Sequence, residues 1–113
     1  MVRRWQPDRG DILLLQFHPQ RGREQSGYRP ALVLSPRSYN MKVGLVLLCP
    51  ITSKEKGYPF EVLLPSSLKT KGVILSDHIK SLDWSVRGAR FVERVPKGSL
   101  EQVLLRVEAL LHG

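Results

Sequence analysis

The chain has 113 residues, the size of one ordinary domain, and is long enough to bury a core without help from a metal or disulfides. It carries 18 lysine and arginine residues against 10 aspartate and glutamate residues, and the resulting net charge of +8 lies within residues 1–90. This distribution favours a folded surface that binds a polyanion, and nucleic acid is the first candidate. A basic protein whose charge serves only solubility is the alternative.

Several classes of protein are disfavoured by the same composition. Cys49 is the single cysteine and is flanked by apolar residues, so no intramolecular disulfide can form and a reducing compartment is expected. No segment is apolar for long enough to form a signal peptide or a membrane span. The sequence therefore predicts a soluble cytoplasmic protein with one domain, residues 1–113, and no membrane association.

Glycine and proline residues separate apolar segments that have the length of strands. Consecutive apolar residues within several segments indicate burial on both faces, one inside a small barrel and the other under a helix or a second subunit. The pattern predicts a small, mainly antiparallel sheet or barrel. The expected strands are Asp11–Phe17, Ala31–Ser35, Leu45–Ile51, Phe60–Leu64, Val73–Leu82 and Ala89–Val95.

A helix is expected at the end of the chain. Ser99 and Gln102 match a capping box, and an apolar stripe with helical spacing follows them. The stripe is expected to pack on the sheet while charged residues face solvent. The apolar positions are Leu100, Val103, Leu104, Val107, Leu110 and Leu111, and the expected solvent-facing residues are Glu101, Arg106 and Glu108.

The loop from His18 to Arg29 concentrates charge between the first two expected strands. It gathers Arg21, Arg23 and Arg29 around one carboxylate, Glu24. Loops held by a packed scaffold often carry chemistry, so the pattern indicates a site that handles anions. The alternative is an exposed hairpin loop in which Glu24 only pairs with neighbouring arginines.

Cysteine pairs, zinc-spaced His/Cys clusters and a phosphate-binding glycine loop are all lacking, so no metal or other cofactor is expected. The remaining side chains suit cleavage of RNA by attack of the 2′-hydroxyl on its neighbouring phosphate, which needs a base, an acid and positive charge. Glu24 is the candidate base, and Arg29 is expected to neutralise the phosphoryl oxygens. Thr52 follows an apolar segment and can donate to phosphate, although turn formation is the alternative.

The segment Val73–Lys80 carries a second titratable pair. Alternation along one strand places Asp77 on one face, as a buried hydrogen-bond acceptor, and His78 with Lys80 on the other face, toward a ligand. Aromatic residues near the basic segments can stack on unpaired bases or pack in the core. They are Tyr28, Tyr58, Phe60 and Trp84.

Several separated motifs resemble the MazF/PemK toxins, the endoribonuclease components of bacterial toxin–antitoxin pairs. The resemblance runs over nearly the whole chain and keeps the order of the motifs. They are PDRGD at Pro7–Asp11, EQSGYRPALVLSP at Glu24–Pro36, TSKEKGYPFEV at Thr52–Val62 and LSDHIKSLDW at Leu75–Trp84, followed by the final helix.

The resemblance implies a mainly β fold, an SH3-like small β-barrel with a C-terminal helix, and a homodimer with an RNA groove near the subunit interface. It implies metal-independent cleavage of single-stranded RNA at short sequences, leaving 2′,3′-cyclic phosphate and 5′-hydroxyl ends, with Glu24, Arg29 and Thr52 as the catalytic residues. The expected RNA-binding residues are His18, Arg21, Arg23, Gln25, Lys54, Lys56, Asp77, His78 and Lys80.

The expected partner is a MazE-like antitoxin whose acidic, disordered tail occludes the RNA groove. Many similar family members have Asp in place of His18 and Gln in place of His78, so both histidines add a group that titrates near neutral pH. Two alternatives stay open: a non-catalytic CcdB-like toxin that binds DNA gyrase, and an inactive RNA-binding module.

Overall fold

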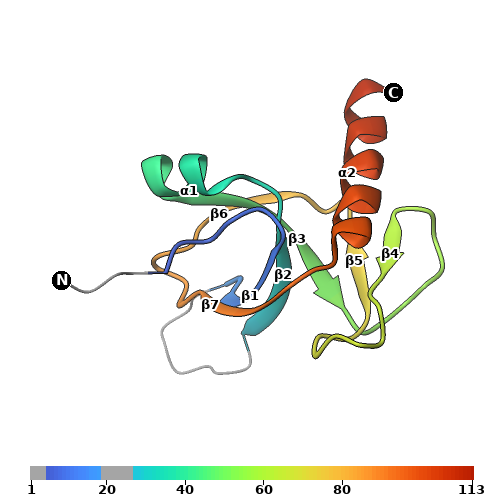
Figure 1. The fold of residues 1–113 in the computed structure, drawn as a ribbon, viewed down its shortest axis with the longest axis horizontal. Coiled ribbons are helices and arrows are strands. Elements are labelled where there is room, and N and C mark those ends of the chain that lie inside the picture. The colour runs from blue at the N-terminus through green and yellow to red at the C-terminus, as the bar shows by residue number, and fades with distance from the viewer. Residues whose placement is uncertain (1–4, 19–26) are drawn as a thin grey trace.

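The computed structural model describes residues 5–18 and 27–113. Its strands form an antiparallel sheet with the order β4-β5-β3-β2-β1-β7, and β6 pairs with β3 off this path (Figure 1). The elements are β1 (Asp11–Gln16), β2 (Tyr28–Val33), α1 (Arg37–Val43), β3 (Leu45–Thr52), β4 (Glu61–Leu63), β5 (Val73–Leu75), β6 (Lys80–Asp83), β7 (Arg90–Arg94) and α2 (Lys97–His112).

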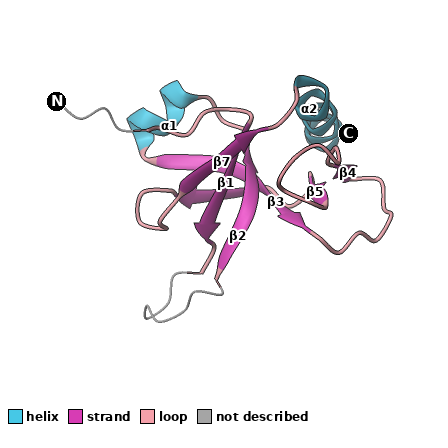
Figure 2. Cartoon of the chain, turned by 60° about the horizontal axis from the view of Figure 1, so that its bottom comes forward, coloured by secondary structure: helices cyan, strands magenta, loops and turns pink. Residues whose placement is uncertain are grey.

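The mainly β fold with a C-terminal helix is confirmed. The sheet curls as a small barrel does, but within the described residues β4 and β7 are its two ends and do not pair with each other. Figure 2 shows α2 beside β4 and β5, at the other end of the sheet from α1. The expected strand boundaries hold to within about three residues for most segments, the usual scatter for strand ends.

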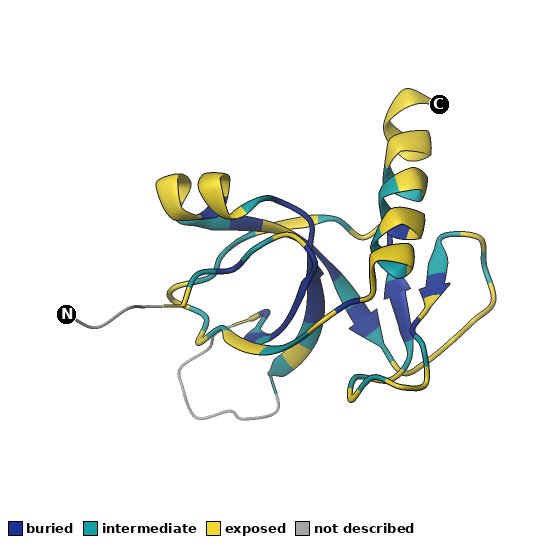
Figure 3. Cartoon of the chain, viewed as in Figure 1, coloured by how far each residue is buried: buried dark blue, intermediate teal, exposed yellow. Residues whose placement is uncertain are grey.

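Two hydrophobic clusters lie on opposite faces of the central strands, as the consecutive apolar residues predict. Ile12, Leu32 and Cys49 face each other across β1, β2 and β3 and belong to the cluster under α2. Their neighbours Leu13 and Ala31 belong to the second cluster, which Leu82 and Trp84 cover. Figure 3 shows this burial along the central strands, whereas most of α2 is exposed. The central strands are therefore packed on both faces.

The single strand expected over Val73–Leu82 is wrong, because the chain turns after Leu75. Ser76 is buried, its hydroxyl and its backbone N–H both donate to the Phe60 carbonyl, and the N–H of His78 donates to the Leu75 carbonyl at 3.1 Å. Two short strands result, and they pair with different ends of β3: β5 with its C-terminal end and β6 with its N-terminal half.

The helix α1 was not expected from the sequence. It begins after Pro36 and ends at Gly44, which has the left-handed φ of 83° that suits glycine at a helix C-terminus. Asn40 anchors it, because its side-chain amide donates to the carbonyls of Pro7 at 2.9 Å and Ser35 at 3.0 Å. The helix was missed because seven mostly polar residues are too few to show a helical repeat of apolar positions.

The C-terminal helix is confirmed, but three details of the expectation are wrong. Ser99 is not the N-cap, because the helix begins after Pro96 and the Ser99 N–H donates to the Pro96 carbonyl. Arg106 is half-buried and donates to the Pro59 carbonyl at 2.9 Å. Leu110 and Leu111 are exposed, because the last turns extend past the sheet (Figure 1).

Candidate nucleic-acid interface

Arg29 and Thr52 meet in one cleft at the ends of two neighbouring strands. β2 pairs with β3 through Ala31 and Pro50, and continuing this antiparallel register sets Arg29 opposite Thr52. The cleft has a volume of about 460 Å³. It is lined by Arg29, Pro50, Ile51, Thr52, Lys54, Lys56, Tyr58, Glu61, Leu75 and His78.

A second hollow of about 370 Å³ shares Arg29, Thr52 and Lys54 with this cleft and adds Ser53 and Lys71. The two are treated together as the basic cleft, defined by the residues that line either of them. Fixed cations on a partly enclosed surface attract anionic ligands and raise their local concentration. The shape and charge of the basic cleft therefore suit a phosphodiester chain.

Glu61 is the acidic residue that lines the basic cleft, and it shapes the loop that carries the lysines. Its carboxylate accepts the backbone N–H of Lys56 at 3.0 Å and that of Gly57 at 2.8 Å. A carboxylate held by two backbone donors is occupied with the loop rather than with proton transfer. Glu61 thus fixes the loop that presents Lys54 and Lys56.

The Thr52 hydroxyl is positioned to donate. Its oxygen accepts the backbone N–H of Lys54 at 3.1 Å, which leaves the hydroxyl hydrogen able to reach an anion. The backbone of Thr52 is fixed from behind by Gly72, where an added Cβ would lie 2.1 Å from the Thr52 carbonyl oxygen. Gly72 also has a φ of +116°, which side-chain-bearing residues rarely adopt.

Tyr58 joins the loop before β4 to the turn after β5. Its hydroxyl donates to Asp77 Oδ1 at 3.0 Å and lies 3.4 Å from His78 Nε2. Partial burial and the hydrogen bond to Asp77 raise the pKa of Tyr58, so the phenol stays protonated. Asp77 is a hydrogen-bond acceptor as expected, but it is half-buried instead of buried, and the predicted separation of Asp77 and His78 on opposite faces is wrong.

The other predicted site residues fall in three groups. Lys54, Lys56 and His78 line the basic cleft, whereas Lys80 lies on β6 opposite Leu48 and lines neither hollow. His18 is exposed just after β1, where Arg87 donates to the Phe17 carbonyl and, at 3.2 Å, to that of Gln16. Glu24, Arg21, Arg23 and Gln25 lie outside the described residues.

Sequence reasoning missed the supporting residues of the site. Tyr58 was expected only to stack or pack, and Glu61, Lys71 and Gly72 were not singled out. The glycine that opens a strand after Lys71 was a usable signal, because such a glycine often marks a close backbone approach. The hydrogen bonds of Tyr58 and Glu61 depend on the path of the loop and left no pattern in the sequence.

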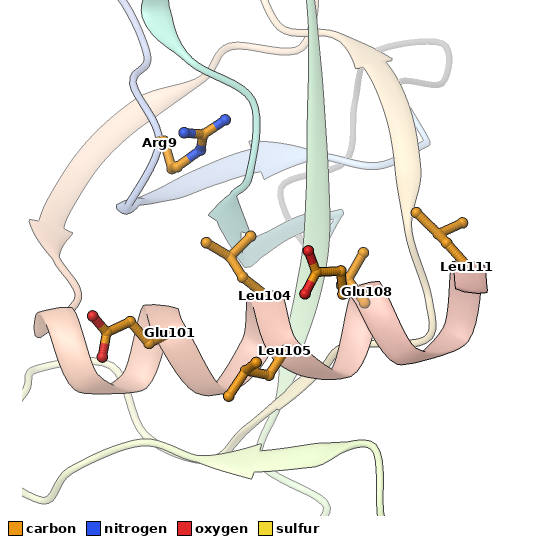
Figure 4. Close-up of a pocket in the computed structure, with 7 residues that line it drawn as sticks. Arg9, Glu101, Leu104, Leu105, Glu108 and Leu111 are labelled. Carbon is orange, nitrogen blue, oxygen red and sulfur yellow. The ribbon is translucent and has the colours of Figure 1, made fainter. Parts of the chain in front are cut away.

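A cavity of about 550 Å³ lies along α2, away from the basic cleft (Figure 4). Leucine and valine side chains line most of it, together with Arg9, Glu101 and Glu108. An apolar groove with two carboxylates does not suit a polyanion. In the described part of the chain, no three His, Cys, Asp or Glu side chains gather where they could hold a metal ion. Over the same residues, no helix is long and apolar enough to cross a membrane.

Comparison with known proteins identifies the family. A family model described as PemK-like, MazF-like toxin of type II toxin–antitoxin system matches residues 8–111. The endoribonuclease toxin MazF of Escherichia coli K12 is 44% identical over 111 residues, which span 98% of this chain and 99% of that protein. The endoribonuclease PemK of Escherichia coli is 33% identical over 108 residues, 92% of this chain and 81% of that protein.

Solved structures agree with the sequence relatives. A crystal structure of MazF from Deinococcus radiodurans is 48% identical, has a TM-score of 0.87 and covers 97% of this chain and 100% of that chain. In a MazE–MazF structure from the same organism, the matched chain is 44% identical with a TM-score of 0.86, covering 96% of this chain and 97% of that one. The similarity is thus near full length in both sequence and fold. The chain belongs to the family of PemK-like, MazF-like toxins of type II toxin–antitoxin systems.

Proposed function

We propose that this chain is a toxin that acts as a metal-independent endoribonuclease on single-stranded RNA, in the cytoplasm where messenger RNA is found. The observation that carries the proposal is that Arg29 and Thr52 line one cleft with Lys54 and Lys56. Relatives named endoribonuclease that are 44% and 33% identical support the reaction class.

The proposed reaction uses a nucleophile that the substrate already carries. The 2′-hydroxyl gives its proton to the base and attacks the adjacent phosphorus, and the bond from phosphorus to the 5′-oxygen breaks. The departing 5′-oxygen takes up a proton from solvent, so the products are a 2′,3′-cyclic phosphate and a 5′-hydroxyl. Arg29 neutralises charge on the phosphoryl oxygens through its planar donor fork, and Thr52 donates a second hydrogen bond. Glu24 remains the proposed base for the 2′-hydroxyl.

The remaining binding residues act on the chain of phosphates around the reacting one. Lys54, Lys56 and Lys71 attract neighbouring phosphates, and His78 contacts substrate from the turn after β5. The Tyr58 ring is available for stacking on an unpaired base. His18, Arg21, Arg23, Gln25, Asp77 and Lys80 are proposed as further RNA-binding residues.

We infer two protein partners. The first is an antitoxin of the MazE type, because the matched structures include MazE–MazF complexes and the net charge of +8 favours an acidic, disordered tail. The second is another copy of this chain, because exposed apolar residues mark interaction surfaces. They gather on α1 and β3 (Tyr39, Met41, Val43, Leu47) and on α2 (Leu105, Leu110, Leu111).

The test is to incubate the protein with a long single-stranded RNA in EDTA and to map the new ends. We expect discrete cuts with cyclic phosphate ends, no cutting of a strand with 2′-deoxyribose at the mapped site, and a loss of about 10²–10³-fold in rate for Arg29→Ala and for Thr52→Val. Arg37→Ala is the matched control, because Arg37 is an exposed arginine on α1, at the opposite end of β3 from Thr52.

The possible outcomes discriminate between the functions. RNA binding without any cuts would indicate an inactive RNA-binding module, and gyrase binding without cuts a CcdB-like toxin. Cuts that need added metal would contradict the mechanism. If Arg29→Ala and Thr52→Val cleave as fast as Arg37→Ala, the reaction does not occur in the basic cleft.

A further inference from the structure

The Tyr58 hydroxyl, the Asp77 carboxylate and the His78 imidazole form a cluster at the edge of the basic cleft. The Tyr58 oxygen lies 3.0 Å from Asp77 Oδ1 and 3.4 Å from His78 Nε2, and Nε2 lies 3.8 Å from Asp77 Oδ1. The His78 side chain is 50% exposed, and both His78 and Tyr58 line the cleft that holds Arg29. An imidazole here therefore reaches both the cluster and a bound ligand.

The hydrogen bonds fix how the imidazole connects to the cluster. An ionised carboxylate only accepts, so the single hydrogen of the Tyr58 hydroxyl is used on Asp77. The Tyr58 oxygen can then only accept from His78, which places a hydrogen on Nε2. The other ring nitrogen, Nδ1, is the atom at which a second proton is gained or lost.

The charged groups around His78 have opposite effects on the protonation of its ring. Asp77, on its own turn, favours the protonated ring, and Glu61 adds a carboxylate at the start of β4. The protonated ring is disfavoured by three cations, which are Arg29 on β2 and Lys54 and Lys56 on the loop before β4. A phosphodiester in the cleft neutralises these cations, so ligand binding and protonation of the ring favour each other.

We propose that His78 is a proton-linked substrate-binding residue: the protein takes up a proton at His78 when single-stranded RNA enters the basic cleft, and Tyr58 and Asp77 are positioning residues for the ring. The inference rests on the proposed function for the identity of the ligand. It predicts that RNA affinity rises as the pH falls through the range in which histidine titrates.

The experiment measures binding separately from cleavage. A fluorescent single-stranded oligonucleotide with 2′-O-methyl riboses cannot be cut by 2′-hydroxyl attack, and its dissociation constant is measured by anisotropy from pH 8.5 to pH 5.5 at constant ionic strength. We expect the parent to bind about tenfold more tightly at pH 5.5 than at pH 8.5, because the protonated ring adds one charge-assisted hydrogen bond to phosphate. His78→Gln should bind equally at both ends of the range.

Two further histidine variants show where the proton is taken up. His112→Gln changes an exposed histidine at the end of α2, and His18→Gln changes the exposed histidine after β1. His112→Gln should keep the pH dependence of the parent, whereas His18→Gln tests a second proposed RNA contact as the rival source of the proton. If His18→Gln removes it while His78→Gln keeps it, the proton is taken up elsewhere and the inference is wrong.

Variants of the positioning residues test the cluster itself. Tyr58→Phe removes the acceptor for Nε2, and Asp77→Asn removes the carboxylate that favours the protonated ring. Each should move the midpoint of the pH dependence to lower pH, a change that loss of packing alone would not produce. Circular dichroism and a urea transition confirm that each variant is folded. An unchanged midpoint in both would remove Tyr58 and Asp77 from the proposal.

Failure of the inference can be told from failure of the proposed nuclease activity. A parent that cleaves RNA but binds the uncleavable oligonucleotide with one affinity from pH 8.5 to 5.5 overturns the inference alone. Proton-linked binding that His78→Gln abolishes, without cleavage of ordinary RNA, supports the inference and overturns the nuclease. Absence of binding at every pH overturns the inference as well.

Discussion

Replacing Gly72 with alanine tests how the sheet positions Thr52. The new Cβ would lie 2.1 Å from the Thr52 carbonyl oxygen, 2.8 Å from its carbonyl carbon and 3.0 Å from Ser53 Cα, all of them backbone atoms that cannot rotate away. The φ of +116° adds strain of about 1–3 kcal/mol. Overpacking adds about 1–3 kcal/mol more, so unfolding should become easier by about 2–6 kcal/mol in total.

Two other glycines separate the two effects in the same assay. Gly44→Ala shares the positive φ, at +83°, but its Cβ meets no atom within 4 Å, so it should show the strain alone. Gly98→Ala, near the start of α2, has neither feature and should change the free energy of unfolding by less than about 1 kcal/mol. Urea denaturation gives the three values, and the excess of Gly72→Ala over Gly44→Ala measures the close approach.

The same variant should lower activity, because the contact is with Thr52, the proposed donor to the phosphate. A displacement of about 1 Å at a reacting group can cost about 100-fold in rate, so we expect kcat/KM of folded Gly72→Ala to fall by about 10- to 100-fold. Gly44→Ala, at the end of α1, should keep the parent value. The reasoning is refuted if Gly72→Ala is no less stable than Gly44→Ala and cleaves RNA as fast as the parent.

Three further predictions concern buried and half-buried titratable groups. Burial raises the pKa of Cys49 to about 12, so a disulfide reagent at pH 8 should label the protein only in denaturant; rapid labelling of folded protein would contradict this. Burial raises the pKa of Asp11 although Arg94 lies 2.6 Å away, so Arg94→Met should cost about 1.5–3 kcal/mol at pH 7 and less as the pH falls and Asp11 takes up a proton. Burial opposes ionisation of Glu93, but the N–H groups of Thr70 and Lys69 lower its pKa overall. The ionised carboxylate therefore stabilises the fold above its ordinary pKa, and this stabilisation is lost as the pH falls. Urea transitions of Glu93→Gln should show a cost of about 1 kcal/mol at pH 7 that shrinks toward pH 3.

The core of the site could be predicted because it depends on sheet register and local motifs. Arg29 and Thr52 lie next to long apolar segments whose strands were recognisable, and antiparallel pairing of those strands brings them together. The two buried faces were predictable for the same reason, since uninterrupted apolar residues leave no polar face. Features that depend on one buried polar contact, such as the Asn40 amide that anchors α1, left no repeating pattern in the sequence.

The error over residues 73–82 explains why the Tyr58 cluster was missed. Strict alternation along one strand would hold Asp77 and His78 on opposite faces, so no single partner could contact both. The turn that begins at buried Ser76 breaks the alternation and brings both side chains to the Tyr58 hydroxyl, nineteen and twenty residues earlier in the chain. A Ser76→Val variant would remove the hydroxyl that donates to the Phe60 carbonyl and holds this turn. The proton linkage should then weaken together with the turn, because the contacts of His78 exist only where the strand is interrupted.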